Sequence, residues 1–205
     1  MPKVPLALCA ALVLLAIAPA DADELRLLSY TRLGHAAVFD TKSPRREPGI
    51  GFGIRAEIDS FAIDVSFLNL VMGIHPVDEV RDMSAGSLFK ITGLRYLSPR
   101  ARTSAYLGGG MSWGHLMLGR AAPPGGGTTS WGGHGLQGEL TAGYELARKS
   151  PVRVFVQADA TAPLFRASSQ VFSYPEPGKV VNVGNDTVYA PTVVVSFGVG
   201  WQRVR

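Results

Sequence analysis

The sequence has almost no cysteine and, beyond its start, no apolar run long enough for a membrane helix. The single cysteine of the 205 residues, Cys9, lies inside an apolar N-terminal stretch. If that stretch is removed, no thiol remains, which excludes disulfides, thiolate nucleophiles and cysteine-ligated metals. After residue 22, no segment reaches the roughly 18 consecutive apolar residues that a transmembrane helix needs. Stability must therefore come from a packed core, from closure of a sheet or from strands inserted into a membrane.

The sequence also has only a small excess of positive over negative charges. The formal net charge is +4, and Lys3 contributes one of these charges from the N-terminal stretch. Nucleic-acid binding needs a denser basic surface, so the composition gives no case for a nucleic-acid partner.

The N-terminus has the pattern of a secretory signal peptide. Lys3 precedes an apolar run over residues 4–18, and small residues follow at Ala18, Ala20 and Ala22. The run is shorter than the ~20 apolar residues of a spanning helix, which favours a cleaved signal over a retained anchor. We therefore expect export, with cleavage after Ala20 or Ala22 removing residues 1–22, and one domain over residues 23–205.

Most of the remaining chain alternates apolar and polar residues with period two, which predicts β-strands. In IGFGIRAEID, residues 50–59, even positions carry Ile, Phe, Ile, Ala and Ile, whereas odd positions carry Gly, Gly, Arg, Glu and Asp. No comparable stretch shows a 3.6-residue repeat with helix caps, so the sequence predicts an all-β fold. We expect eight strands, over residues 27–39, 50–59, 61–71, 86–97, 103–117, 135–147, 152–164 and 191–202.

The links between these strands alternate in length. Long links follow the first, third, fifth and seventh strands, and short links follow the second, fourth and sixth. In an up-and-down barrel the odd links lie at one end and the even links at the other, whereas a Greek-key sandwich has no reason to keep this order. Outer-membrane barrels combine short periplasmic turns with long external loops. The order therefore predicts an eight-stranded antiparallel up-and-down transmembrane β-barrel.

Such a barrel turns its apolar faces to lipid and its polar faces inward. Glycines share the polar faces with charged residues, so small side chains leave room for long ones, and opposite charges can pair where water is scarce. The interior of an eight-stranded barrel is just wide enough for side chains to fill. We therefore expect a packed polar lumen closed by ion pairs. The predicted lumen charge network consists of Arg55, Glu57, Asp59, Asp64, Glu139, Arg153 and Asp159.

The expected strand over residues 86–97 carries one charge on each face. Lys90 alternates with Leu88 and Leu94, whereas Arg95 shares the opposite face with Phe89. One of the two must face lipid unless a bulge changes the register. A cation facing lipid costs ~2–4 kcal/mol at the midplane but close to zero near an interface. Since Arg95 lies beside a short turn, we expect Lys90 inward and Arg95 outward.

With these features the chain resembles the small eight-stranded outer-membrane β-barrel proteins of Gram-negative bacteria, the outer-membrane protein A type of transmembrane barrel. The resemblance rests on the signal pattern, on AYLGGGMSWG at 105–114, on GYEL at 143–146 and on the last strand, 193–201. The resemblance covers roughly residues 24–205. It implies a place in the cell outer membrane, with outer-membrane lipid, lipopolysaccharide and the barrel assembly machinery as partners. It implies neither one activity nor an oligomeric state.

Four histidines and one serine are the candidate catalytic or metal-binding residues. His35, His75, His115 and His134 fall near the long-link end of the barrel, and Ser112 is close to His115 in sequence. Imidazoles act as metal ligands and general bases. No two of these histidines, however, have a metal-ligand spacing such as H-x₃-H. We therefore expect no enzyme, no metal site and no cofactor.

Two alternatives to a structural or interaction protein with exposed loops stay open. An outer-membrane enzyme that modifies lipid would use the rim residues His35, His115 and Ser112. A secreted barrel that holds a small apolar ligand, like a lipocalin, would invert the faces and leave Arg55 and Glu57 in water. The sequence does not decide whether a porin-like barrel of this kind conducts.

Overall fold

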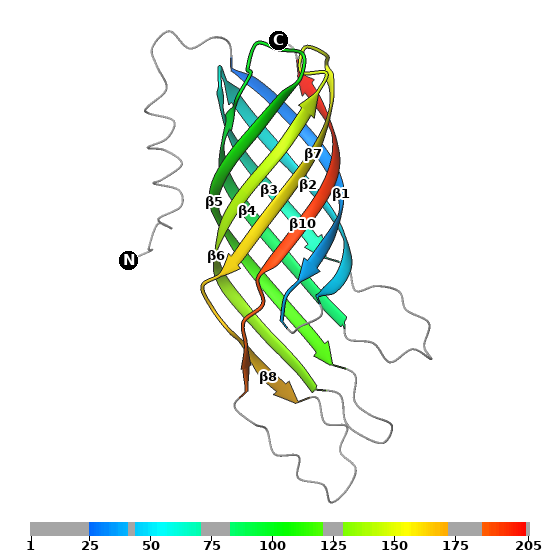
Figure 1. Ribbon diagram of the computed structural model, residues 1–205, viewed down its shortest axis with the longest axis vertical. Helices are drawn as coiled ribbons and strands as arrows, with labels where there is room; N and C mark the ends of the chain where they lie inside the picture. The colour runs from blue at the N-terminus through cyan, green and yellow to red at the C-terminus, as the bar shows by residue number, and fades with distance from the viewer. Residues whose placement is uncertain (1–24, 41–43, 71–82, 121–128, 172–185, 204–205) are drawn as a thin grey trace, which may run out of the picture.

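The computed structural model describes residues 25–40, 44–70, 83–120, 129–171 and 186–203. The predicted all-β fold is confirmed (Figure 1). The described residues form the strands β1 (Arg26–Val38), β2 (Arg45–Ile58), β3 (Phe61–Leu70), β4 (Met83–Tyr96), β5 (Ser104–Arg120), β6 (Thr129–Leu146), β7 (Val152–Pro163), β8 (Ala167–Val171), β9 (Thr187–Val188) and β10 (Thr192–Arg203). Within these ranges, a search for helices that could span a membrane finds none. The signal-peptide prediction lies outside the described residues.

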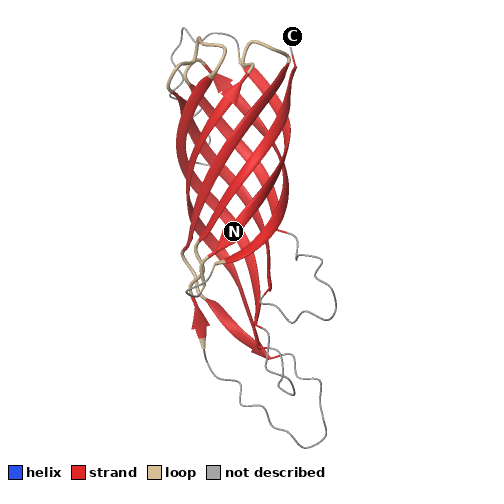
Figure 2. Ribbon diagram, turned by 45° about the vertical axis from the view of Figure 1, so that its right-hand side comes forward, coloured by secondary structure: helices blue, strands red, loops and turns tan. Residues whose placement is uncertain are grey.

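Eight strands close into an antiparallel ring (Figures 1 and 2). β1 pairs with β2 and β10, β7 pairs with β6 and β10, and the β5–β6 pairing completes the ring. We call one end the turn end, because residues 59–60, 97–103 and 147–151 connect strands there, and the opposite end the loop end. β1 begins and β10 ends at the turn end. The predicted eight-stranded up-and-down barrel is therefore confirmed.

The link between β7 and β10 differs from the prediction, which gave it no strand. β6 extends toward the loop end well past Gln137, the partner of the last β7 residue, Pro163. Proline cannot donate a ladder hydrogen bond, so β7 ends there and leaves the edge of β6 free. β8 pairs with that edge, with Thr129 opposite Val171, and the two-residue β9 pairs with β8. The short polar segment ASSQV had no alternation that could reveal this pairing.

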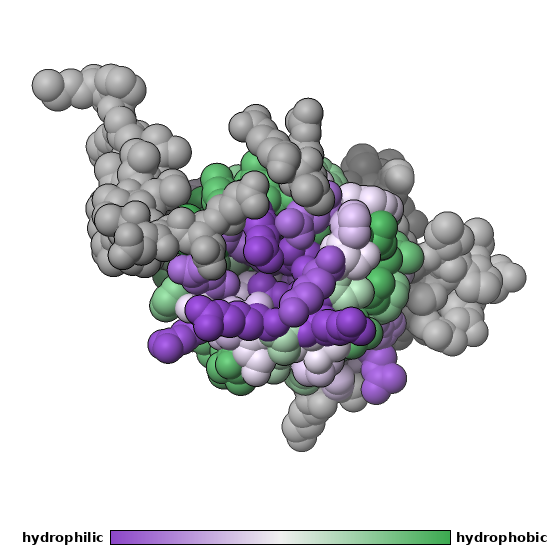
Figure 3. Space-filling view, turned by 90° about the horizontal axis from the view of Figure 1, so that it is seen from above, coloured by the Kyte–Doolittle hydropathy of each residue, from purple (hydrophilic) through white to green (hydrophobic). Residues whose placement is uncertain are grey.

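Inside and outside are divided as the alternation predicts. In β2 the Ile54 side chain is 54% exposed on the outer wall, whereas the neighbouring Arg55 is 0% exposed inside. The lipocalin alternative, which needs the reverse, is therefore wrong for this fold. Lys90 is buried inside and Arg95 is exposed outside, as expected from their distances to the turn end. Seen from the turn end, hydrophilic residues gather over the mouth and hydrophobic residues lie around the sides (Figure 3).

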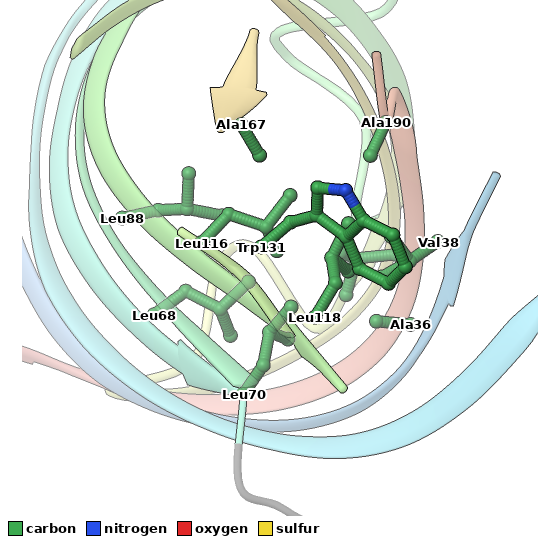
Figure 4. Close-up of a cluster of buried hydrophobic side chains, with 11 residues drawn as sticks. Ala36, Val38, Leu68, Leu70, Leu88, Leu116, Leu118, Trp131, Ala167 and Ala190 are labelled. Atoms are coloured by element: carbon green, nitrogen blue, oxygen red, sulfur yellow. The ribbon is translucent and has the colours of Figure 1, made fainter. Parts of the chain in front are cut away.

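The interior is not polar throughout, which corrects the prediction of a polar lumen. Toward the loop end, apolar side chains from most of the strands converge around Trp131 (Figure 4). In this part of the barrel the inward positions of β1, β3 and β5 carry alanine, valine and leucine, so alternation could not mark the lumen face as the polar one. We call this group the apolar plug; it consists of Ala36, Val38, Leu68, Leu70, Leu88, Leu116, Leu118, Trp131, Ala167, Ala190 and Val194.

Candidate functional site: the lumen charge network

Arg55 on β2 lies at the centre of the polar half of the lumen. Its Nε donates to Asp64 Oδ2 at 2.9 Å, across the β2–β3 pair. Its Nη1 donates to Glu145 Oε2 and to the Tyr96 hydroxyl, both at 3.1 Å, and its Nη2 donates to Gln157 Oε1 at 3.3 Å. One guanidinium thus connects side chains from five strands around the ring.

Aromatic rings enclose the same guanidinium. Its Cζ lies 4.9 Å from the ring centre of Tyr106, 5.1 Å from that of Phe155 and 5.6 Å from that of Tyr30. The Tyr30 hydroxyl also donates to Asp64 Oδ1 at 2.7 Å, so the carboxylate that pairs with Arg55 is held from two sides. A cation surrounded by ring faces and carboxylates keeps its charge satisfied without water.

Toward the turn end, a second group is centred on Glu57. Arg153 Nη1 donates to both Glu57 oxygens at 2.8 Å and to Glu145 Oε1 at 2.9 Å. Arg148, which follows β6, brings its Nη2 to 3.3 Å from Glu57 Oε2 and its Cζ to 3.5 Å from the ring centre of Tyr96. These contacts close the mouth of the lumen at the turn end.

A third group lies between Arg55 and the apolar plug and is centred on Asp159. Lys90 Nζ is 2.8 Å from Asp159 Oδ1 and 3.1 Å from Glu139 Oε2. Arg32 Nη1 donates to the other Asp159 oxygen at 2.6 Å, and Thr141 Oγ1 donates to Oδ1 at 2.7 Å. Burying these charges is less costly because each of them lies beside an opposite charge.

The positive and negative charges buried inside the barrel nearly balance. The described residues include six buried cations and six buried anions, and the buried carboxylate of the part-exposed Asp40 pairs with one of the cations, Arg45. The cations are Arg32, Arg45, Arg55, Lys90, Arg148 and Arg153, and the anions are Glu47, Glu57, Asp64, Glu139, Glu145 and Asp159. The ion pairs within this set connect strands across the interior of the barrel.

The structure brings six of the seven predicted network residues inside the barrel, and it places the seventh elsewhere. Asp59 is exposed in the β2–β3 turn, with a φ of 52°, so its assignment to the lumen was wrong. The alternation of β2 ends one residue earlier, because a tight turn needs a residue that accepts the left-handed conformation, and aspartate does so more readily than most.

Sequence reasoning missed Arg32, Glu145, Arg148 and three tyrosines as members of the network. β1 alternates poorly, which hid Arg32 and Tyr30. Glu145 is buried on the inward face of β6, and only its contacts with Arg55 and Arg153 show that it is a shared partner. Tyr96 and Tyr106 are apolar-looking residues whose hydroxyls reach Glu145 and Gln157. No local sequence signal could have shown these contacts.

The glycines of the inward faces make room for these side chains, as predicted. A Cβ added at Gly198 would lie 2.2 Å from Phe155 Cζ, whereas one added at Gly138 would meet nothing nearer than 4.0 Å.

We expect Gly198→Ala to lower the free energy of unfolding by about 1–3 kcal/mol, because the ring must shift inside a filled cage. Gly138→Ala, the matched control, should leave it nearly unchanged. Urea unfolding in detergent micelles measures both, and equal effects of the two variants would contradict the steric explanation.

The candidate catalytic residues do not come together. Ser112 is buried inside and donates to Glu139 Oε1 at 2.6 Å. His35, His115 and His134 are exposed on the outer wall, and His75 lies outside the described residues. Since Ser112 and His115 point to opposite faces of β5, they cannot act as nucleophile and base. In the described ranges, no group of three or more histidine, cysteine, aspartate or glutamate residues could hold a metal ion.

A comparison with solved structures supports the fold. Neisserial surface protein A matches with a TM-score of 0.61 at 10% identity, covering 85% of this chain and 96% of that chain. Ail of Yersinia pestis matches at 0.55 and 11%, covering 88% and 100%. The N-terminal barrel domain of Pseudomonas aeruginosa OprF matches at 0.51 and 10%, covering 88% and 100%. No family model and no curated sequence matches. The chain thus has the fold of small outer-membrane β-barrels.

Proposed function

We propose that the protein is a closed, non-enzymatic barrel of the cell outer membrane that acts through its loop end, in a structural or binding role. The observation that carries the proposal is the interior, where buried side chains gather both toward the turn end and toward the loop end. The charge network occupies the turn end and the middle, and the apolar plug occupies the part nearer the loop end. Within the described residues, the candidate catalytic side chains Ser112 and His115 lie on opposite faces of β5, which favours a role for the outer surface over chemistry.

The paired interior argues for a seal rather than a pore. Eight strands leave a bore that side chains alone can fill. Arg55 and Arg153 each contact two carboxylates, and Lys90 does so as well. An ion that entered would have to break these buried contacts and then cross the apolar plug.

The residues exposed on the outer wall favour membrane lipid and lipopolysaccharide as partners. Exposed apolar side chains such as Phe52, Phe89 and Trp113 cover the wall. Arg46 and Arg166 are exposed near the loop end, where cations would meet the phosphates of an outer leaflet. We also propose that residues 1–22 direct export and that the barrel assembly machinery inserts the chain.

Surface recognition by a barrel of this fold has support from one of the similar structures. Ail of Yersinia pestis was solved in complex with the heparin analogue sucrose octasulfate. For the present chain we propose the loop end as the binding surface, because β5 and β6 extend farthest from the barrel there and β8 lies beside them (Figure 1).

Planar-bilayer recording tests the closed lumen. We expect the purified barrel to insert without producing stable conductance steps, because the charge network and the plug both block the bore. A general porin recorded under the same conditions controls for insertion, and protease protection of the barrel confirms that it is in the bilayer. Reproducible ohmic steps with each insertion of the wild-type protein would overturn the proposal in favour of a porin.

A further inference from the structure

Two histidines on the outer wall are cross-strand neighbours. His115 on β5 and His134 on β6 are directly paired in the register of the two strands, and both side chains are exposed. Nineteen residues separate them along the chain, so no local spacing motif marks the pair. The hairpin register alone brings them together. They lie outside the lumen and take no part in the charge network.

Their separation suits a shared metal ion. Directly opposed residues on one face of an antiparallel pair have Cβ atoms about 4.5–5.5 Å apart. Two imidazoles at that separation can direct one nitrogen each toward a single ion. Imidazole is a preferred ligand of Zn²⁺, Ni²⁺ and Cu²⁺. The remaining coordination positions would be open to water or to an oxygen of a lipid headgroup.

The pair also lies on the water-accessible side of the apolar wall. Counted along the strands from the turn end, His115 lies eleven residues from Ser104 and His134 lies twelve residues from Leu146, whereas Leu33 in the wall lies only seven residues from Arg26. The next outward-facing row toward the turn end is apolar and consists of Leu136, Trp113, Phe89 and Phe67. β5 continues to Arg120 and β6 begins at Thr129, so both strands extend beyond the pair on its loop-end side. Hydrated ions can therefore reach it.

We propose that His115 and His134 form a two-histidine site for a divalent transition-metal ion on the outer wall near the loop end. Bound there, the ion joins β5 to β6 on the loop-end side of Gln137, where the pairing of β6 with β7 has ended. The site is independent of whether the lumen conducts, so it goes beyond the proposed function.

Trp113 supplies an internal probe of the site. Its ring centre is 6.3 Å from that of His134, so Cu²⁺ bound by the pair would quench its fluorescence. We expect Cu²⁺ titration of the full chain in detergent micelles to give a saturable loss of emission. Trp113→Phe should lose that component, although Trp131 and Trp201 remain. Zn²⁺, which does not quench by this route, should compete with Cu²⁺ and restore the emission.

The decisive variants are single histidine replacements. His115→Gln and His134→Gln should each weaken Cu²⁺ binding by about tenfold or more, since each removes half of the protein ligands. His35→Gln is the matched control, because His35 is also exposed on the outer wall, on β1. Heat-modifiable migration checks that each variant is folded. Unchanged quenching in the His115→Gln/His134→Gln double variant, or an equal loss in His35→Gln, would overturn the proposal.

Discussion

Replacing Arg55 by methionine is expected to lower the free energy of unfolding of the barrel by about 3–5 kcal/mol. Methionine fills much of the same volume but leaves Asp64 without its guanidinium partner and removes one of the two arginines that contact Glu145. The loss is large because the penalty is that of an uncompensated buried charge, which exceeds the net value of the ion pair that was removed. The rings of Tyr106 and Phe155 would also lose the cation between them.

Arg95→Met is the matched control for this experiment. It makes the same chemical change one residue before β4 ends at Tyr96. The Arg95 side chain is exposed there, and its Cζ lies 5.5 Å from the ring centre of Phe61. Because solvent compensates an exposed charge, its effect should stay below about 1 kcal/mol. Equilibrium unfolding in urea, followed by heat-modifiable migration, compares the two. Similar small effects would mean that the charge network does not stabilise the barrel.

An arginine placed in the middle of the apolar wall should be costly, and the same arginine at the loop end should not. Leu33 is 65% exposed near the middle of β1, between the exposed Ile50 and Phe197 of the adjoining strands. Leu164 is 70% exposed just after the end of β7. We expect Leu33→Arg to destabilise the barrel in phospholipid vesicles by ~2–4 kcal/mol and Leu164→Arg by ~0–1 kcal/mol, because the cost depends on depth in the hydrocarbon.

The two leucine variants carry the same substitution at similar exposure. Any difference in their stability therefore shows whether hydrocarbon or water surrounds each position. Urea titration of vesicle-inserted protein, followed by tryptophan fluorescence, provides the measurement. If both variants are as stable as the wild type, the wall does not face hydrocarbon, and the membrane assignment on which the proposed function depends is wrong. A large cost at Leu164 alone would instead place the membrane boundary farther toward the loop end.

The fold was predictable because its signals are local. Period-two alternation assigned Ile54 to the wall and Arg55 to the lumen, and the alternating link lengths fixed the up-and-down order. Lys90 could be placed inside from the cost of a charge in lipid and from the distance of Arg95 to a turn. Each of these arguments uses residues that are near one another in the sequence, or a length that can be counted along it.

The tertiary structure decided what depends on pairing between distant strands. Alternation could show that Glu145 and Asp159 lie on polar faces, but not that they share Arg55, Arg153, Lys90 and Arg32 among them. The apolar plug, the β6–β8 pairing and the His115–His134 neighbours follow from register and strand length, which hydrogen bonds around the closed ring determine together. The sequence by itself therefore determined which side faces outward in clearly alternating strands such as β2 and β7, because the alternation of side chains is a property of a single strand. Which residues meet inside and on the wall was decided only when the ring closed, because contact requires two strands in a defined register.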